Sequence, residues 1–288
     1  SALVDFIDVD PNNGLISIDK LKEKLQKADI EGKLPTVLIA VHLAGQPCDM
    51  EEICFLGKKY DFKIIEDAAH AIGAIYKGES VGNCHYSDIT VFSFHPVKII
   101  TSGEGGASLT NDPGLASRMR LLRSHGITRN VDEMIYPSEE SWYYEQIDLG
   151  YNYRMTDIQA ALVVNQLTRL DEYINRRIEI VNYYSEKLSF NNFFPLEQKN
   201  DRRSSWHLYI IRLAGEKKLR NHLVTVLKKN EIGVNLHYIP VYRHPYINFK
   251  GSLDGAEEYY DSALTIPLFP AMSFDDVDFI SSIINSNL

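Results

Sequence analysis

The fold is decided by one stretch, KIIEDAAHAIGA at residues 63–74, in which a β-branched run ends in adjacent carboxylates and is followed by small residues. Working outward, residues 36–42 predict a strand buried on both faces, residues 49–60 a helix, and residues 89–94 another strand. Asp49 begins that helix with Glu52 three positions on, which is the spacing of a capping box. Strands that alternate with helices are typical of βαβ units, so we predict an α/β fold with a mostly parallel sheet.

The second half of the chain predicts a connecting helix and a smaller domain. Thr156 and Gln159 have capping-box spacing, and apolar residues then recur at helical spacing over residues 158–188, which favours one connecting helix or a helix pair. After a polar loop we expect a strand, a helix, a strand and a final helix at residues 206–213, 216–230, 233–238 and 274–284. We therefore predict a large α/β domain with its connecting helix at residues 1–190 and a small α+β domain at residues 191–288.

The composition is that of an ordinary globular protein and excludes several functions. The chain has 288 residues, 44% hydrophobic and 24% charged, and its net charge of −9 makes nucleic acid or an anionic membrane a poor partner. No apolar stretch approaches the ~18 residues that a membrane span requires. Cys48, Cys54 and Cys84 have no CxxC spacing, which is typical of reduced thiols. We therefore expect a cytoplasmic protein with no nucleic-acid or membrane partner.

The residues best placed for chemistry lie after two neighbouring strands. Reactive groups of open α/β sheets gather just past the carboxyl ends of the strands. Asp67 ends one predicted strand, and Lys98 follows the next one, ahead of a glycine-rich turn. Burial among apolar neighbours keeps a lysine partly neutral, as a Schiff-base nucleophile requires, and a nearby acid suits a protonated pyridine nitrogen. Together the two residues suggest pyridoxal phosphate as a cofactor.

Other interpretations of these residues are weaker, although each residue taken alone also has a common structural explanation. A phosphate-binding P-loop is excluded because Lys98 precedes the glycines of the turn instead of following them. A strand-end aspartate often caps a helix, and a lone lysine is often solvated. A zinc site lacks regular spacing among its candidate ligands, so we predict no metal; these candidates are Cys84, His85, Asp88 and His95.

Four ordered motifs identify a family. They are EDAAHAIG at 66–73, VFSFH at 91–95 with Lys98, GEGG at 103–106 and LGYNYRMTD at 149–157. In these motifs the sequence resembles the sugar aminotransferases of the DegT/DnrJ/EryC1/StrS family, which are pyridoxal 5′-phosphate enzymes of aspartate aminotransferase fold type I. The resemblance runs from Phe6 to the end of the chain and includes VHLAG at 41–45 and WHLY at 206–209.

The resemblance implies a role for each matching residue near the cofactor. It makes Lys98 the Schiff-base lysine, which later moves the proton between donor and cofactor, and Asp67 the partner of the pyridinium nitrogen. Ser93 matches a hydroxyl ligand of the phosphate. His70 would lie by the phenolic oxygen of the cofactor, and Ala69 would pack on the face of its ring.

The same resemblance implies an active site shared between subunits. Asn152 matches a residue that reaches the phosphate from the neighbouring subunit, so the expected active unit is a homodimer. Arg154 suits the carboxylate of the donor or forms a plain surface salt bridge. His95 contacts substrate or caps the lysine turn. His237 and Tyr238 resemble a segment near the sugar site, and a core histidine is the alternative.

The resemblance predicts conversion of a nucleotide-linked 4-keto-6-deoxy sugar to its 4-amino sugar, with L-glutamate as donor and 2-oxoglutarate as by-product. WYYE at 142–145 and HPY at 244–246 look most like the branch of pseudaminic acid synthesis, which acts on a UDP-linked 2-acetamido-2,6-dideoxy-4-ketohexose for glycans of lipopolysaccharide or flagellin. Two alternatives stay open. One is a sugar dehydratase of the same fold. In such dehydratases a histidine replaces the Schiff-base lysine, so the presence of Lys98 disfavours this alternative. The other is a non-catalytic binding relative.

The beginning of the chain departs from the family pattern. Family members carry an N-terminal segment ahead of the strand that matches residues 6–10, and this segment supplies part of the sheet and a Gly-Thr turn that holds the phosphate. The sequence contains no Gly-Thr pair, and Ser1 already lies close to that strand. We therefore expect either a truncated piece of a longer protein with weakened cofactor affinity, or completion of the sheet by something else.

Overall fold

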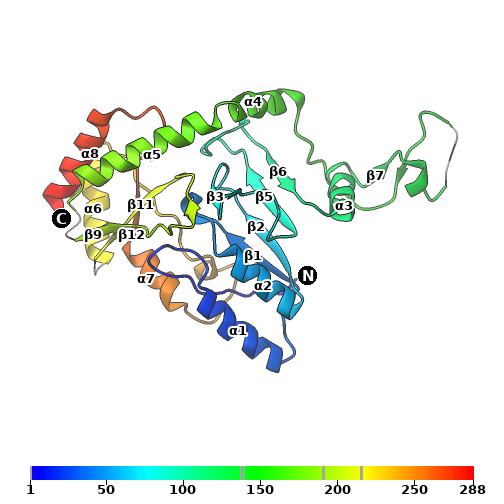
Figure 1. Cartoon of the computed structure of the whole chain (residues 1–288), viewed down its shortest axis with the longest axis horizontal. Helices are drawn as coiled ribbons and strands as arrows, with labels where there is room; N and C mark the ends of the chain where they lie inside the picture. The colour runs from blue at the N-terminus through cyan, green and yellow to red at the C-terminus, as the bar shows by residue number, and fades with distance from the viewer. Residues whose placement is uncertain (1, 137, 139, 190–191, 215–216) are drawn as a thin grey trace.

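The computed structural model describes residues 2–136, 138, 140–189, 192–214 and 217–288, and it is built around a four-stranded sheet (Figure 1). The strands, in spatial order, are β1 (Val37–Val41), β2 (Lys63–Asp67), β5 (Ile89–Ser93) and β6 (Gly106–Leu109). β1, β2 and β5 run parallel, whereas β6 is antiparallel to β5. The predicted α/β fold with a mostly parallel sheet is therefore confirmed.

The register places the carboxyl ends of β2 and β5 side by side. Asp67, the last residue of β2, pairs with Val91 of β5, and the Ala68 amide donates to the Val91 carbonyl at 2.9 Å. On the other side, the His42 amide donates to the Asp67 carbonyl at 3.0 Å. The end of β2 is thus held by both neighbours, which makes it a fixed platform for side chains.

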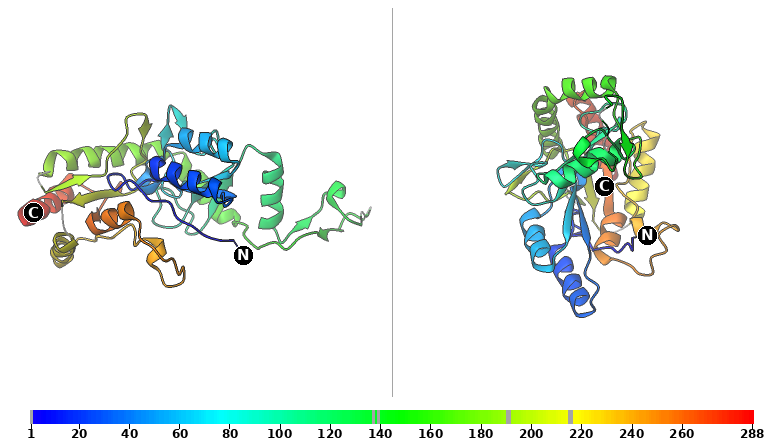
Figure 2. Two further views of the ribbon diagram at one scale, coloured as in Figure 1. Left: turned by 90° about the horizontal axis from the view of Figure 1, so that it is seen from below. Right: turned by 90° about the vertical axis from the view of Figure 1, so that its right-hand side faces the viewer.

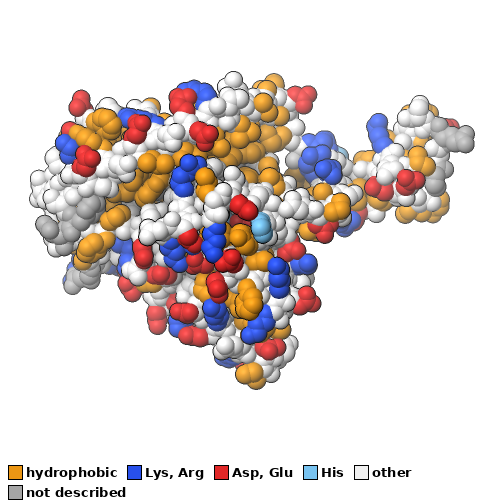
Figure 3. All heavy atoms as spheres, viewed as in Figure 1, with side chains coloured by type: hydrophobic (Ala, Val, Ile, Leu, Met, Phe, Trp, Pro, Cys, Tyr) orange, Lys and Arg blue, Asp and Glu red, His pale blue; other side chains and the backbone are white. Residues whose placement is uncertain are grey.

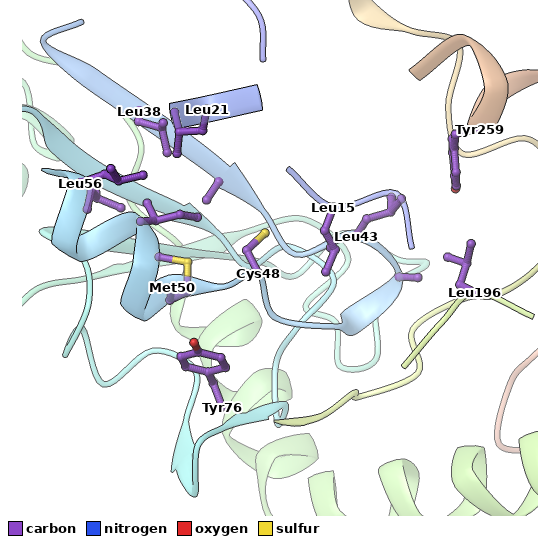
Figure 4. Packing of buried hydrophobic residues seen from close by; sticks show 14 of the residues in the cluster. Leu15, Leu21, Leu38, Leu43, Cys48, Met50, Leu56, Tyr76, Leu196 and Tyr259 are labelled. Carbon is purple, nitrogen blue, oxygen red and sulfur yellow. The ribbon is translucent and has the colours of Figure 1, made fainter. Parts of the chain in front are cut away.

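Helices α1 (Ile18–Ile30) and α2 (Met50–Tyr60) share a hydrophobic cluster with β1 and β2. Leu21 of α1 and Leu38 of β1 meet within this cluster (Figure 4). Tyr259, far along the chain, belongs to the same cluster. The core beneath the sheet therefore joins the first and last thirds of the sequence.

The start of α2 differs from the sequence prediction. Asp49 is the N-cap residue, but its side chain makes no capping hydrogen bond. Its two carboxylate oxygens instead lie 2.6 Å from Lys199 Nζ and 2.7 Å from Arg202 Nη2. Charge-assisted contacts are about twice as strong as neutral ones, so the two cations take the carboxylate from the helix N-terminus. The expected capping box with Glu52 is absent here.

After α3 (Pro113–Arg123), an arm projects from the body of the molecule (Figure 1 and the left view of Figure 2). Pro113 occupies the first turn of α3, and Asp112 caps that helix through two backbone amides. The arm contains the antiparallel pair β7 (Ile127–Thr128) and β8 (Glu145–Gln146) and the short 3₁₀ helix η2 (Val131–Glu133).

The long helical pattern forms a pair of helices, α4 (Asp157–Leu167) and α5 (Leu170–Lys187). The Gln159 amide donates to Thr156 Oγ1 at 3.3 Å, and the Thr156 amide donates to Gln159 Oε1 at 3.0 Å, so the predicted capping box is confirmed. α5 leads from the arm side of the molecule to a second sheet (Figure 1). Within the described ranges, no helix is long and apolar enough to cross a membrane.

The second sheet has three antiparallel strands in the order β12 (Ala263–Ile266), β11 (Tyr209–Leu213) and β9 (Phe193–Pro195). It shares a hydrophobic core with α6 (Lys217–Lys229), α8 (Phe274–Asn287) and the end of α5. The other elements are α7 (Asp254–Ser262), η1 (Leu43–Gly45), η3 (Val241–Arg243) and the small sheet of β3 (Ile75–Tyr76), β4 (Glu79–Ser80) and β10 (Arg202–Arg203).

The strand predicted at residues 233–238 is wrong. Only an isolated bridge joins Asn235 to Thr265, and the peptide between His237 and Tyr238 is cis. Val234 and Leu236 pack against the hydrophobic core of the second sheet. The segment therefore has the alternating apolar pattern of a strand but does not form a strand. The domain division at residue 190 stays a prediction, because residues 190 and 191 lie outside the described residues.

Candidate active site

The site begins at the end of β2. Asp67 is half-buried, and its Oδ1 accepts a hydrogen bond from the Ala69 amide at 3.0 Å, which fixes the direction of the carboxylate. Among the described residues nothing hydrogen-bonds its second oxygen, Oδ2. One carboxylate oxygen is thus anchored by the backbone while the other is available to a ligand.

Lys98 lies in a tight turn directly after β5. Its amide donates to the His95 carbonyl at 3.0 Å, and Thr101 Oγ1 closes the loop by donating to the Phe94 carbonyl at 2.8 Å. The side chain is half-buried, and burial lowers the pKa of its amine, while the Asp67 carboxylate partly opposes that shift. Lys98 therefore lies within electrostatic reach of Asp67 and loses its proton more readily than a solvated lysine.

Two glycines allow the close packing behind these residues. A Cβ at Gly106 would lie 2.7 Å from the Phe92 carbonyl oxygen, across the β5–β6 pair. Gly73 has a φ of 76°, and a Cβ there would clash with Ile174 Cδ1 of α5. The glycines of the GEGG and EDAAHAIG motifs thus let a strand and a helix approach the site from behind.

Three histidines lie within electrostatic reach of Lys98, and all three are held neutral. Burial lowers the pKa of His70 to about 3, with the Lys98 charge adding to the shift. Burial lowers the pKa of His207 to about 2, with smaller contributions from His70 and Lys98. Burial and Lys98 also lower the pKa of His237. Near neutral pH these imidazoles therefore act as uncharged hydrogen-bonding groups.

His207 is the site residue that sequence reasoning missed. Its ring centroid lies 4.5 Å from that of His70, its exposed fraction is 5%, and its Nδ1 is buried without a partner among the described residues. The only signal in the sequence was its place in WHLY, a segment whose strand begins at Tyr209. Nothing local shows that this histidine meets another one more than a hundred positions earlier in the chain.

The structure brings His237 and Tyr238 to the same place from the second half of the chain. Tyr259 Oη donates to the His237 carbonyl at 2.8 Å, and His237 Nδ1 lies 2.8 Å from Thr265 Oγ1. These contacts hold the segment so that Tyr238 Oη lies 3.2 Å from His70 Nε2. His237 is half-buried, unlike a true core histidine.

The adjacent carboxylates of EDAAH have separate surroundings. Glu66 is buried, and its Oε2 lies 2.7 Å from His42 Nε2 while its Oε1 accepts hydrogen bonds from Ser87 at 2.5 Å and Thr90 at 3.1 Å. Burial alone would raise the pKa of Glu66, but these hydrogen bonds outweigh it and lower the pKa. Glu66 is therefore an ionised structural group behind the site, and only Asp67 of the pair faces Lys98.

Ser93 and His95 flank the lysine turn. Ser93 ends β5, and its Oγ accepts a hydrogen bond from the His95 amide at 3.4 Å. The exposed His95 ring has its Nδ1 at 3.5 Å from the Val97 amide nitrogen and its Nε2 at 3.9 Å from Glu104 Oε1. Both residues therefore lie at the carboxyl end of β5, beside the backbone that carries Lys98.

Asn152 and Arg154 lie apart from this cluster. Asn152 forms an isolated antiparallel bridge with Ser124, after α3, and both Asn152 and Arg154 are exposed. In the part of the chain that the structure describes, neither side chain has a hydrogen bond or an ion pair. Within one chain these two predicted residues are not brought to Lys98.

The residues at the strand ends fit pyridoxal 5′-phosphate. Such a cofactor needs an amine that is readily neutral, a carboxylate for its ring nitrogen and donors for its phosphate. Lys98 has the lowered pKa, Asp67 has a free oxygen, and Ser93 supplies a hydroxyl beside them. Among the described residues, no cluster of His, Cys, Asp or Glu could hold a metal ion.

Comparison with known proteins agrees with this chemistry. A sequence model of the DegT/DnrJ/EryC1/StrS aminotransferase family matches residues 1–285. The chain belongs to this family. It is 38% identical over 292 residues to the UDP-4-amino-4,6-dideoxy-N-acetyl-beta-L-altrosamine transaminase of Campylobacter jejuni subsp. jejuni serotype O:2, an alignment that covers 100% of this chain and 74% of that protein.

Solved structures have the same fold. Helicobacter pylori PseC, an aminotransferase involved in the biosynthesis of pseudoaminic acid, superposes with a TM-score of 0.87 at 27% identity over 98% of this chain and 73% of that one. Spr1654 from Streptococcus pneumoniae superposes in its PMP form with a TM-score of 0.86 at 29% identity, over 98% of this chain and 75% of that one. It has also been solved in a PLP form, with a TM-score of 0.84.

Membership of this family confirms three predictions from the sequence. The fold is that of the pyridoxal-phosphate-dependent aminotransferases, the protein is a sugar aminotransferase, and its cofactor is pyridoxal 5′-phosphate. When bound, this cofactor supplies an electron sink that stabilises a carbanion on the amino donor. The individual site residues stay predictions whose placement the geometry above describes.

Proposed function

We propose that the protein transfers the amino group of L-glutamate to a UDP-linked 2-acetamido-2,6-dideoxy-4-ketohexose and so makes a 4-amino sugar for surface glycans of the pseudaminic acid type. The names of two relatives support this substrate, one a UDP-4-amino-4,6-dideoxy sugar transaminase and the other an aminotransferase of pseudoaminic acid biosynthesis. The observation that carries the reaction type is the half-buried Lys98, whose pKa burial lowers, within electrostatic reach of Asp67.

Lys98 has two tasks in this proposal. Only a neutral amine has the lone pair that bonds the aldehyde carbon of the cofactor, and burial favours that form. With the cofactor bound, Nζ would also take the proton that leaves the α-carbon of glutamate and pass it to the cofactor. Several hydrogen bonds close the turn at residues 94–102 and so fix the backbone that carries Lys98.

The groups around Lys98 bind and orient the cofactor. Asp67 Oδ2 would pair with the protonated ring nitrogen while Oδ1 stays on the Ala69 amide, and the small Ala69 side chain would leave room for the ring. Ser93, at the end of β5, would donate its hydroxyl to the phosphate. His70, held neutral, adds no positive charge beside the phenolic oxygen. The Asp67 carboxylate would thus be the one negative charge of this group of residues, and it would lie at the ring nitrogen.

We also propose that two copies form the active unit. Hydrophobic side chains gather on the arm and on the body next to α4 (Figure 3). Monomeric proteins rarely expose large apolar patches, and a second copy placed here would bring the unpaired Asn152 and Arg154 to a neighbouring site. The large exposed side chains of these two regions are Val131, Ile135, Tyr136, Trp142, Tyr144, Leu149, Tyr151, Tyr153, Ile158, Leu162, Val164 and Leu167.

A cytoplasmic location fits the same proposal. Cys48, Cys54 and Cys84 are all free thiols in the structure. Free cysteines persist most readily in a reducing compartment, where nucleotide-linked sugars and glutamate are also at hand.

The direct test is turnover. Purified protein is mixed with L-glutamate and a panel of UDP-linked and dTDP-linked 4-keto sugars, and 2-oxoglutarate is measured. We expect 2-oxoglutarate to form with the UDP-linked 2-acetamido sugar, to vanish in Lys98→Ala, and to persist in Lys58→Ala, a lysine of α2 remote from the site. Turnover of another sugar would correct the substrate, and no turnover with any of them would reject the proposal.

Borohydride separates transamination from the dehydratase alternative. Reduction should fix the cofactor covalently on Lys98, which peptide mass spectrometry detects. A protein that binds cofactor but cannot be trapped in this way would favour a dehydratase, in which the cofactor is not covalently held.

A further inference from the structure

Three groups from separate segments form a hydrogen-bonded line at the site. The Ala44 amide nitrogen lies 3.3 Å from His70 Nδ1, and His70 Nε2 lies 3.2 Å from Tyr238 Oη. Ala44 follows β1, His70 follows β2, and Tyr238 belongs to the second half of the chain. The line therefore crosses the site from one part of the fold to another.

The direction of this line follows from the chemistry of its first member. A backbone amide can only donate, so the His70 Nδ1 that receives it must carry a lone pair. A neutral imidazole then has its single proton on Nε2, and Nε2–H donates to Tyr238 Oη. Since burial lowers the pKa of His70 to about 3, the ring is neutral near pH 7 and the assignment holds there.

The backbone at Ala44 is arranged to maintain this direction. Ala44 has a φ of 59°, in the left-handed region that residues with a side chain rarely adopt, and it is buried. Strained conformations of this kind persist where the surrounding structure holds them, often at functional sites. In this conformation the Ala44 amide donates to His70 Nδ1.

Tyr238 is the end of the line that a ligand can reach. Its exposed fraction is 52%, and its oxygen already accepts from His70, so its own O–H proton is free to point elsewhere. Burial and the nearby Asp67 charge raise the pKa of the phenol, which keeps that proton in place. No other hydrogen bond from Tyr238 Oη exists within the described residues.

We propose that Tyr238 is a hydrogen-bond donor to an acceptor oxygen of the bound reactants, and that Ala44 and His70 are positioning residues that set the direction of this donor. The inference rests on the proposed function and deepens it. The acceptor is either the carbonyl oxygen of the keto sugar or the phenolic oxygen of the cofactor, and in the second case His70 acts on that oxygen through Tyr238.

The direction of the hydrogen bonds along this line is tested first, by nitrogen-15 NMR of the histidines in the protein, with and without cofactor. We expect a pyridine-type signal for His70 Nδ1 and a pyrrole-type signal for Nε2 near neutral pH, assigned by their loss in His70→Gln. The opposite tautomer, or a protonated ring, overturns the proposal. This measurement needs no turnover, so it is decided even if the proposed sugar is wrong.

The role of the phenol is tested with Tyr238→Phe. Tyr86→Phe is the control, because Tyr86 is a half-buried tyrosine outside the site whose hydroxyl has no hydrogen-bond partner among the described residues. Loss of one functional hydrogen bond lowers kcat/KM by roughly tenfold. If the acceptor is the sugar carbonyl, only the sugar half-reaction slows. If it is the phenolic oxygen, both half-reactions slow and the pH at which the bound cofactor changes its visible absorbance shifts.

The positioning role is tested at His70. His70→Gln keeps one acceptor and one donor on the side chain, whereas His70→Met keeps neither. We expect His70→Gln to retain clearly more activity than His70→Met, and the double variant His70→Met/Tyr238→Phe to lose no more than the worse single variant. The proposal would be overturned if the losses of activity in the double variant were additive. It would also be overturned if Tyr238→Phe had the same half-reaction rates and cofactor absorbance as Tyr86→Phe.

Discussion

The neutral state of His207 predicts a specific loss of stability in mild acid. Its exposed fraction is 5%, and burial lowers its folded-state pKa to about 2. In the unfolded chain a histidine has a pKa of about 6.5. Between these two pKa values the unfolded state binds a proton that the folded state does not. The stability that neutral His207 contributes is therefore fully present above the unfolded-state pKa and is lost as pH falls below it. At pH 5 the loss is about 2 kcal/mol, from roughly 1.4 kcal/mol per pH unit.

The assay compares urea unfolding of the wild type and His207→Phe at pH 7 and pH 5, at one protein concentration. Phenylalanine keeps a ring against His70 and removes a nitrogen, Nδ1, that has no partner among the described residues. We expect the wild type to lose about 2 kcal/mol more than the variant between the two pH values. The exposed His222 of α6 provides the control, His222→Gln, which should behave as the wild type does. Equal losses in wild type and His207→Phe would show that His207 takes up a proton in the folded protein, and would refute the reasoning.

Three further predictions follow from the same geometry. Asp67→Asn should lower the rate of transamination by on the order of 100-fold, because it removes the charge that pairs with the ring nitrogen. Single-turnover kinetics with glutamate measure this rate, and a rate near that of the wild type would show that Asp67 is not the partner of the ring nitrogen. Glu66→Gln should destabilise the protein by about 2 kcal/mol at pH 7, since charge-assisted hydrogen bonds to His42, Ser87 and Thr90 weaken. The folded-state pKa of Glu66 is lowered from 4.5, so the difference in stability between the wild type and Glu66→Gln should shrink as pH falls below that value. Equal urea midpoints for the two proteins at pH 7 would contradict this prediction. Mixing inactive Lys98→Ala with Asn152→Ala should restore part of the activity if sites are shared between two copies, whereas a mixture as inactive as its components would indicate that they are not.

Local sequence predicted the elements that depend on neighbours in the chain. The capping box at Thr156 forms because its partner, Gln159, is three residues away and no other group competes for either side chain. The one expected at Asp49 fails because two cations about 150 positions later take the carboxylate. The two sites have the same spacing, and only the folded chain distinguishes them.

The candidate site divides in the same way. Asp67 and Lys98 could be paired from the sequence, because the carboxyl ends of parallel strands meet at one edge of a sheet. The placement of His207, His237 and Tyr238 could not be worked out from spacing, because they come from the second half of the chain. Contacts with Tyr259 and Thr265 hold the segment of His237 and Tyr238, and His207 packs against the His70 ring. No periodicity records such contacts.

The sequence by itself determined that this protein is an α/β aminotransferase with a lysine and an aspartate at adjoining strand ends. Short-range rules are enough for the fold and for the two strand ends, because hydrophobic period, caps and glycines act between residues a few positions apart, whereas the aminotransferase family followed from the resemblance of whole motifs. The tertiary structure alone decided that Glu66 is a buried structural group while Asp67 faces the lysine, and that His70 joins Ala44 to Tyr238. Burial and hydrogen-bond direction set the protonation of these groups, and both arise only when distant segments pack together.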